Sequence, residues 1–389
     1  MAPVNKINLE IIRKSLKLLN QYLYLNTGAV GPLSEETVAA IRQEQDYELI
    51  NGRAGVDIYL RKRAIKNEVR VALSKLINAL PEELALTQNT TEGINIVVNG
   101  RNWHKGDEVL TTDIEHGAIL LPLFQIAKRY GVIVKKAKVG TDPVRAIEEQ
   151  ITSRTKLIAL SHVSYSTGAL LPLNDIIHLA HGKGIPVLVD GAQSVGTIPV
   201  DVKALDVDYY SLPGHKWLLG PEGTGALFSR QGRLEELFQP FIGYGSVAQF
   251  SQDETYILRH GAERFEISTM NLPNLAGQKA SLNWLTEKIG WSEIFERTRQ
   301  LAEKVKSQLA AIKGVTVLTP EKAAGLVSFR VLGVEPPTIV ETLAGKKIII
   351  RGIKELAAAR ASIAFYNTEK ELEDFIQSVA ALQNNGNRS

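Results

Sequence analysis

The chain contains no cysteine among its 389 residues. Without cysteine it forms no disulfides, which is compatible with a reducing compartment such as the cytoplasm. It also has no thiolate that could act as a nucleophile.

Long apolar runs and blocks of charge of one sign are also missing. No uninterrupted apolar segment approaches the length of a bilayer span, and the amino terminus opens no signal-peptide pattern. The formal net charge is only +3, and the lysines and arginines are scattered along the chain. We therefore expect a soluble, cytoplasmic protein that binds neither membranes nor nucleic acid.

The length and the order of apolar segments predict two domains. With 389 residues, 44% of them hydrophobic, the chain can build one large and one smaller core. Between residues 24 and 228, short strand candidates alternate with amphipathic helix candidates, which is typical of a mostly parallel α/β sheet covered by helices. We predict a large α/β domain over 21–254, a smaller α+β domain over 255–389, and an N-terminal segment, 1–20, that packs on the small domain.

The most informative motif places one lysine between two glycine-rich turns. A strand candidate at 207–211 leads into this loop and another at 225–228 leads out, so that Lys216 is presented from a tight turn. Glycines in such a loop let a ligand approach the backbone. Lysine forms Schiff bases with carbonyl compounds, and a lowered pKa makes its amine nucleophilic. Taken alone, such a lysine is more often an ordinary exposed side chain in a turn. The neighbouring motifs therefore decide whether Lys216 has a function.

A strand-end aspartate precedes this lysine in the sequence. The apolar run 184–189 ends at Asp190, as expected for a buried parallel strand whose carboxyl end reaches the ligand-binding edge of a sheet. A pyridoxal cofactor requires a carboxylate against its ring nitrogen, because the protonated ring withdraws electrons from a carbanion. A strand-end aspartate alone is more often a cap or turn residue, but together with Lys216 it indicates a pyridoxal-phosphate site.

Two further segments supply candidate contacts for this cofactor. Thr90 and Thr91 fall at the start of a helix predicted after the strand 84–88, where free amides and the helix dipole attract an anion. His116 follows another short strand, 108–112. An ordinary threonine cap and a hydrogen-bonded loop histidine are the alternatives for these residues.

Seven short motifs occur in a characteristic order along the chain: 88–95 (QNTTEGIN), 113–116 (DIEH), 161–168 (SHVSYSTG), 190–193 (DGAQ), 214–216 (GHK), 264–269 (RFEIST) and 360–367 (RASIAFYN). Their order resembles the class V, fold-type I pyridoxal-phosphate enzymes of the cysteine desulfurase-like family, and among these the cysteine/cystine C–S lyases most closely. The resemblance covers nearly the whole chain from about residue 24. It implies the fold-type I transferase fold and the cofactor pyridoxal 5′-phosphate.

The resemblance also implies how the ring of the cofactor is held. Lys216 would carry the cofactor and act as the base and acid at Cα. Asp190 would bind the ring nitrogen, and Gln193 would bond the phenolic oxygen. His116 would stack on the ring and belong to the catalytic group.

The same resemblance implies which residues bind the phosphate and which one binds the substrate. Thr90, Thr91 and His215 would bind the phosphate. Thr269 would reach the phosphate of the partner subunit's cofactor, which implies a homodimer with composite sites. Arg360 would bind the substrate α-carboxylate through two parallel hydrogen bonds, for which a guanidinium is well suited. No metal site is expected.

Three departures from the desulfurase pattern concern the site. Desulfurases carry their reactive thiol on a loop before the Arg-Ala-Ser motif, whereas the corresponding segment here, 348–360, contains no residue that accepts sulfur. Pro213 replaces a serine that bonds the phosphate, and Tyr165 replaces an asparagine beside the cofactor oxygen. The pocket therefore differs from that of a desulfurase.

These features together predict elimination at the β carbon of a sulfur amino acid. We expect a homodimeric lyase that converts cysteine or cystine to pyruvate, ammonia and sulfide or a persulfide, with the sulfur passed to an iron–sulfur scaffold or acceptor protein. Cystine is the better substrate on leaving-group grounds, because a persulfide is a weaker base than a thiolate. Arg53 and Tyr59, in the polar stretch 51–59, are candidates for holding its distal half.

Several alternatives remain open. The same scaffold supports selenocysteine lyase or desulfurase-like chemistry, transamination, epimerisation, and lysis of thioether or sulfoxide substrates. A cofactor-binding regulator or an inactive scaffold of a sulfur-transfer complex is the alternative from a different class. Retention of Lys216, Asp190 and His116 together argues against an inactive scaffold, and no appended DNA-binding segment points to a regulator.

Overall fold

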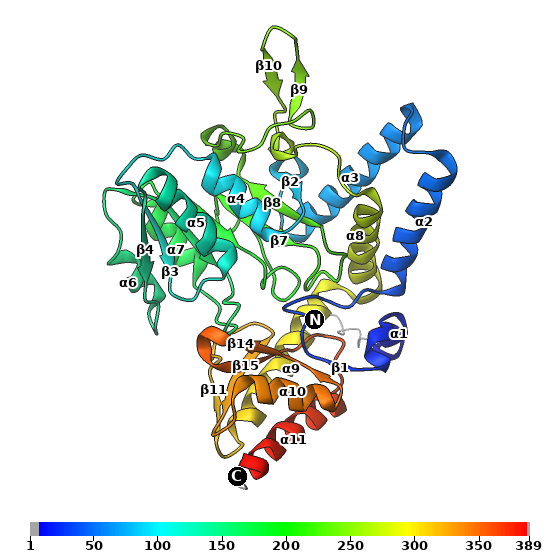
Figure 1. Cartoon of the computed structure of the whole chain (residues 1–389), viewed down its shortest axis with the longest axis vertical. Helices are drawn as coiled ribbons and strands as arrows, with labels where there is room; N and C mark the ends of the chain where they lie inside the picture. Colours follow the sequence, from blue (N-terminus) through cyan, green and yellow to red (C-terminus); the bar gives the residue numbers. More distant parts are fainter. Residues whose placement is uncertain (1–7, 387–389) are drawn as a thin grey trace.

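A seven-stranded sheet forms the centre of the larger part of the molecule (Figure 1). The structure, a computed structural model, describes residues 8–386 and the side chains up to residue 382. The strand order is β2-β8-β7-β6-β5-β3-β4, and only β8 runs antiparallel to its neighbours β2 and β7. The predicted mostly parallel sheet is confirmed. Its strands are β2 (Leu84–Thr87), β3 (Glu108–Thr112), β4 (Ile133–Ala137), β5 (Thr155–Ser161), β6 (Val187–Asp190), β7 (Tyr209–Pro213) and β8 (Gly225–Ser229).

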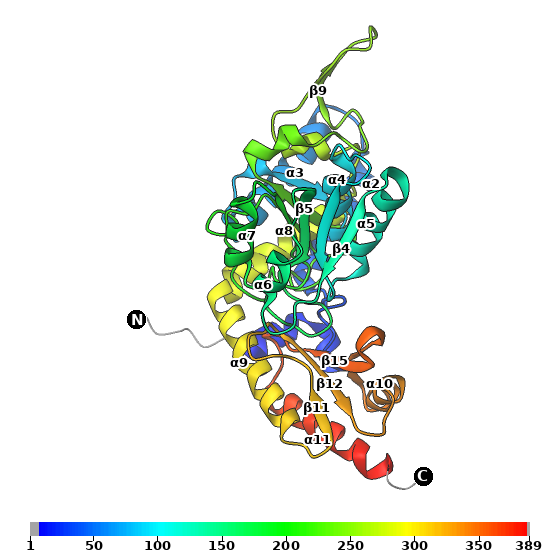
Figure 2. The ribbon, with the colours of Figure 1, turned by 90° about the vertical axis from the view of Figure 1, so that its left-hand side faces the viewer.

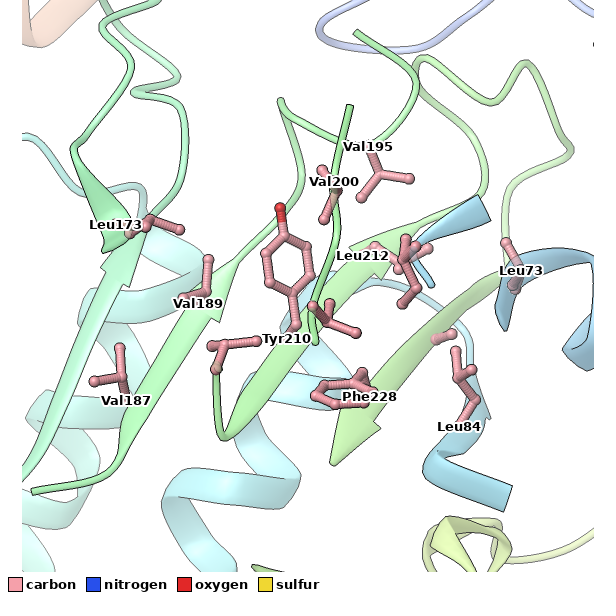
Figure 3. Packing of buried hydrophobic residues seen from close by; sticks show 14 of the residues in the cluster. Leu73, Leu84, Leu173, Val187, Val189, Val195, Val200, Tyr210, Leu212 and Phe228 are labelled. Carbon is pink, nitrogen blue, oxygen red and sulfur yellow. The ribbon is translucent and has the colours of Figure 1, made fainter. Parts of the chain in front are cut away.

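Helices cover both faces of this sheet, so its central strands are buried on each side. Val187 and Val189 of β6 pack into one apolar cluster, whereas Leu188 between them packs into the other. This alternation explains why a parallel strand reads as a continuous apolar run. Figure 3 shows part of the first cluster, with Tyr210 of β7 and Phe228 of β8 among its members. The first face is covered by α3 (Val56–Leu76), α6 (Pro143–Glu148), α7 (Leu173–His181) and α8 (Leu272–Trp284), and the second by α4 (Thr90–Gly100) and α5 (Gly117–Tyr130).

A second, antiparallel sheet lies below the large one in Figures 1 and 2. Its four strands follow the order β11-β12-β15-β14 and pack with three helices around a separate apolar cluster. Near this sheet, β1 (Leu23–Tyr24) pairs in parallel with β13 (Ile348–Ile349), which ties the amino-terminal part of the chain to it. The elements of this part are α9 (Trp291–Ala310), β11 (Val315–Val317), β12 (Leu326–Val331), α10 (Pro336–Gly345), β14 (Arg351–Ile353), β15 (Ala358–Ser362) and α11 (Glu369–Gly386).

The remaining elements connect or extend these two parts. Helix α2 (Glu35–Asn51) packs with α8, and the hairpin of β9 (Val247–Phe250) and β10 (Tyr256–Leu258) projects from the molecule (Figure 1). Helix α1 (Leu9–Ser15) is joined to α11 by an ion pair between Arg13 and Glu371 at 2.6 Å. The short helical turns are η1 (Lys17–Asn20), η2 (Pro81–Glu83), η3 (Gln231–Glu236), η4 (Ala262–Phe265), the π-helix η5 (Leu285–Ile289) and η6 (Lys354–Leu356).

The predicted domain limits stay a prediction. Residues 1–7 of the predicted N-terminal segment lie outside the described residues. Helix α8 belongs to the predicted domain 255–389, yet it packs with α2 and α3 beside the large sheet. Over residues 8–386, no helix combines the length and the apolar character that crossing a membrane requires.

Candidate active site

The carboxyl ends of six strands meet at one edge of the large sheet, and residues at or after five of them form the candidate site. Parallel strands end on the same side, and this edge is where open α/β sheets bind ligands. Asp190 ends β6, and Thr90 begins the helix after β2. His116, Tyr165 and Lys216 lie in the segments that follow β3, β5 and β7. The fold thus brings to one edge residues that are far apart in the sequence.

Lys216 lies in the loop that follows β7. The carbonyl of His215 accepts the amide of Gly31 at 2.8 Å, and the carbonyl of Lys216 accepts that of Leu219 at 3.0 Å. Burial lowers the pKa of the Lys216 ammonium to about 8, although the negative charge of Asp190 acts in the opposite direction. An amine with this pKa is partly unprotonated near neutral pH, which is the form that attacks a carbonyl.

Asp190 is the last residue of β6, and only 4% of its surface is exposed. One of its oxygens accepts the amide of Ala192 at 2.8 Å. Burial raises the pKa of this carboxyl, and the positive charge of Lys216 partly offsets the effect. A cationic donor stabilises such a buried carboxylate, so Asp190 fits a protonated ring nitrogen.

His116 caps the start of α5 and contacts an aromatic ring. Its Nδ1 accepts the amide of Ala118 at 3.1 Å, so the neutral ring carries its proton on Nε2. The ring meets that of Tyr165 edge to face, with centroids 4.8 Å apart. Burial, followed by the charge of Lys216, lowers the pKa of His116 below its usual range. The shift favours the neutral imidazole, which can present a flat face and an N–H donor.

Arg360 lies on β15 with 1% of its surface exposed. Its Nη1 donates to the carbonyl of Tyr165, whereas Nε and Nη2 are buried and find no partner in the described chain. Burial lowers the pKa of this guanidinium to about 9, so it stays charged at neutral pH. Nε and Nη2 form one edge of the guanidinium, and two adjacent donors on one edge match the two oxygens of a carboxylate. The geometry therefore fits the predicted substrate contact.

The predicted phosphate contacts include two buried atoms without a partner among residues 8–386. These are Oγ1 of Thr90, at the first position of α4, and Nδ1 of His215. Asn89 caps α4 by accepting the amide of Glu92 at 3.0 Å, and Thr91 is exposed. Buried polar atoms without partners are costly, so an anion at this helix start would satisfy them. Pro213, the last residue of β7, contributes no hydroxyl.

Gln193 bridges the segment after β1 to the loop after β7. Its Nε2 donates to the carbonyl of Gly28 at 2.7 Å, and its Oε1 accepts the indole N–H of Trp217 at 2.9 Å. A side-chain amide carries two N–H donors, so one is left for the predicted bond to the cofactor. This arrangement also fixes Trp217 directly after Lys216.

Thr269, Arg53 and Tyr59 line surface cavities, and Thr269 also lines one with Gln88 and Glu92, next to Thr90 and Thr91. The hydroxyl of Thr269 is 2.7 Å from that of Tyr244. Thr269 and Arg53 line a surface cavity of about 500 Å³, and Thr269 and Tyr59 line a neighbouring one of about 790 Å³. Lys216 lines neither cavity. A contact of Thr269 with the partner's cofactor stays a prediction.

Two site residues on the small sheet were not identified from the sequence. In the hairpin of β14 and β15, Arg351 stands directly opposite Arg360. Glu355, in η6 between these strands, lies close enough to Tyr165 for its negative charge to help burial raise the pKa of that phenol to about 12. Two short strand candidates four residues apart could have predicted this hairpin and hence the pairing of the arginines.

Glu115 is a further buried carboxyl that the sequence analysis did not single out. It accepts hydrogen bonds from the hydroxyls of Thr112 and Ser161 at 2.5 Å each, and from the Ser161 amide at 3.1 Å. Burial raises its pKa to about 7. These bonds tie the loop that carries His116 to β3 and β5, so Glu115 supports the position of His116.

Comparisons with known proteins agree with this geometry. A probable cysteine desulfurase of Methanothermobacter thermautotrophicus is 32% identical over 387 residues, which cover 94% of this chain and 95% of that protein. The cystine C–S lyase C-DES in complex with its reaction product cysteine persulfide superimposes with a TM-score of 0.91 at 31% identity, covering 94% of this chain and 99% of that one. A C-DES mutant with glycine covalently linked to the PLP cofactor gives a TM-score of 0.91 at 30% identity, covering 95% and 98%.

The predicted resemblance and the fold-type I architecture are confirmed by these similarities. The sequence model of the family described as aminotransferase class-V matches residues 23–375, which is most of the chain. The chain therefore belongs to the aminotransferase class-V family.

Proposed function

We propose that this chain is a pyridoxal-phosphate-dependent lyase that cleaves the Cβ–S bond of cysteine or cystine by elimination. With one water molecule, cystine gives pyruvate, ammonia and the persulfide of cysteine, and cysteine gives pyruvate, ammonia and sulfide. The observation that carries this proposal is a buried lysine with a lowered pKa, a buried aspartate and a guanidinium edge without partners among the described residues, in a chain without cysteine. The names of the similar proteins, a probable cysteine desulfurase and a cystine C–S lyase, support the substrate class.

Lys216 and Asp190 would perform the central steps. When bound, the pyridoxal ring withdraws electrons and so stabilises negative charge at the substrate Cα. The Lys216 amine would hold the cofactor covalently, and as a free amine it would take the proton from the substrate Cα. Its lowered pKa, about 8, suits a base that works near neutral pH. The carboxylate of Asp190 keeps a proton on the ring nitrogen.

Arg360 and His116 would orient the substrate and the ring. The Nε and Nη2 donors of Arg360 bind the α-carboxylate, which fixes the rotation of the substrate relative to Lys216. The neutral imidazole of His116 offers its face to the ring and its Nε2 proton to a neighbouring acceptor. After the Cβ–S bond breaks, the sulfur leaves on the product, because the chain has no thiol to receive it.

For cystine, Arg351 is our candidate for the distal carboxylate. It stands beside Arg360 in the hairpin, and its positive charge acts on both Lys216 and Arg360. Arg53 and Tyr59 line cavities with Thr269 instead, so within one chain they are poorer candidates. A second guanidinium near the first would favour a substrate with two carboxylates over cysteine.

A homodimer would complete the site through Thr269. Large apolar side chains are exposed at the α2–α3 turn and on the β9–β10 hairpin, and both project from the end of the molecule opposite the small sheet (Figure 1). Exposed apolar surface of this kind marks an interface. The residues are Leu49, Ile50, Val56, Tyr59, Leu60, Phe250, Tyr256 and Ile257. Delivery of the sulfur to an iron–sulfur scaffold and a cytoplasmic location stay predictions.

Product analysis tests the proposed function. The purified protein is incubated with cysteine, cystine or selenocysteine, and pyruvate, alanine, sulfide and selenide are measured. We expect pyruvate from cystine with a higher kcat/KM than from cysteine. Alanine as the main product would instead assign desulfurase or selenocysteine lyase chemistry, the second candidate, which the names of the relatives favour. A Lys216→Ala variant is the control for catalysis at this site.

A further inference from the structure

Three polar side chains on one face of α8 bond the loop that carries Lys216. Asn274 donates to the carbonyl of Glu222 at 2.9 Å, and Ser281 donates to that of Leu218 at 2.6 Å. Between them, Gln278 accepts from the hydroxyl of Thr224 at 2.8 Å. Positions 274, 278 and 281 follow the helical repeat, so they form one stripe along the helix. The loop is thus held from a helix that is more than fifty residues away in the sequence.

Gln278 fills the space that two glycines of this loop leave open. A Cβ added at Gly220 would lie 2.0 Å from Oε1 of Gln278, and the other close atoms belong to the same amide. A Cβ added at Gly214 would lie 1.9 Å from Oε1 of Gln278 and 2.1 Å from Oγ1 of Thr224. The expectation that glycines of this loop let a ligand approach the backbone stays a prediction. At Gly214 and Gly220, the Gln278 side chain occupies the space that a Cβ would take.

The Gln278 amide belongs to a buried polar contact with the loop. Gln278 is 1% exposed, and the Thr224 hydroxyl that faces its amide is also 2.7 Å from the carbonyl of Pro221. A hydroxyl carries one proton, so it can donate to one of these two groups and accept an N–H of the amide with a lone pair. An apolar side chain of similar volume would fill the same space without this bond to the loop.

We propose that Gln278 is a positioning residue that fixes the Lys216 loop by occupying the space over Gly214 and Gly220 and bonding Thr224. The proposal rests on the proposed role of Lys216 as the cofactor-bearing lysine. The loop and the Gln278 side chain would then fit each other in shape. A larger residue in the loop should therefore be tolerated when the side chain at position 278 is made smaller. A displacement of about 1 Å at a catalytic group can cost roughly 100-fold in rate.

A double-mutant cycle tests the match. Gly220→Ala should lower kcat roughly 100-fold, with a smaller change in KM, because the new methyl group collides with Gln278. In the Gln278→Ala background the same substitution should cost less than about threefold, since the three nearest atoms at Gly220 all belong to Gln278. Gly214→Ala is the matched control and should stay defective in that background, because Thr224 still obstructs it.

A second readout does not depend on turnover. Competitive labelling of the Lys216 amine at a series of pH values, in protein freed of cofactor, should give a midpoint near 8 in the parent. We expect Gln278→Met, which keeps the volume but not the bond to Thr224, to raise this midpoint while the protein stays folded. Full activity and an unchanged midpoint in Gln278→Met, or no rescue of Gly220→Ala by Gln278→Ala in folded protein, would overturn the proposal. If borohydride reduction of the untreated protein fails to fix cofactor on Lys216, the proposed function fails instead.

Discussion

Replacing Arg360 with methionine separates the function of this arginine from its contribution to folding. The guanidinium is 1% exposed and makes one hydrogen bond, to the Tyr165 carbonyl, while Nε and Nη2 have no partner within the described residues. Each buried unpartnered donor costs about 1–3 kcal/mol, so removing two relieves about 2–6 kcal/mol. The lost charged hydrogen bond was worth about 1.5–3 kcal/mol. The Arg360→Met protein should therefore unfold at an equal or higher urea concentration than the parent.

Arg70 provides the matched control, because it is a buried arginine whose donors are used. It is 3% exposed and bonds the Leu84 carbonyl at 3.1 Å, Glu266 at 2.6 Å and Glu263 at 3.0 Å. Breaking a buried pair costs about 3–5 kcal/mol, so Arg70→Met should clearly lower the free energy of unfolding. The difference between the two changes in the free energy of unfolding measures how much stability the fold loses because Nε and Nη2 of Arg360 have no partner within the described residues.

The assay combines urea unfolding with pyruvate release from cystine. Arg360→Met should be stable and inactive, and Arg360→Lys should be stable with a KM raised roughly 10- to 150-fold, which corresponds to one lost charged hydrogen bond of about 1.5–3 kcal/mol. A loss of stability in Arg360→Met as large as that in Arg70→Met would show that Arg360 is structural. Near-parent KM in Arg360→Lys would refute the two-donor contact with the substrate.

The remaining predictions concern the cofactor. Lys216→Ala should abolish turnover and the covalent link, and borohydride labelling of another lysine in the parent would contradict its role. Asp190→Asn should keep the fold but lower kcat at least roughly 100-fold, or about 2.7 kcal/mol, so near-normal turnover would remove Asp190 from the site. Because the pKa of Lys216 is lowered to about 8, the rate of cofactor uptake should rise with pH and level off above about 8; a rise that continues towards pH 10 would be inconsistent with this. Thr269→Ala should weaken cofactor retention in a dimer, and a fully active monomer in sedimentation would refute composite sites.

The central sheet could be predicted from the sequence because its physical signal is local. The runs 157–160 and 187–189 are apolar because these strands are buried on both faces, and polar residues follow them. Asp190 and Lys216 could be identified for the same reason, since parallel strands end at one edge. To predict that Asp190 and Lys216 lie at this edge, it was enough to know where the strands end and in which order they follow along the chain.

Contacts that depend on register or on distant packing could not be predicted in this way. Arg351 lies opposite Arg360 only because the hairpin of β14 and β15 has this pairing, which a shift of one residue would change. Gln278 reaches Gly220 only because α8 packs beside the loop after β7. The contact of Gln278 with Gly214 and Gly220 has no local signal in the sequence, because it depends on how the helix packs against the loop.

The most direct test of the account is a single-turnover product balance with enzyme in excess over cystine. Pyruvate, alanine and the intact mass of the protein are measured in the same reaction. Elimination predicts close to one pyruvate for each cystine consumed, no alanine, and a protein mass unchanged by sulfur. Alanine in place of pyruvate, or a protein that retains a sulfur atom from the substrate, would contradict the account even if every cofactor contact proved correct.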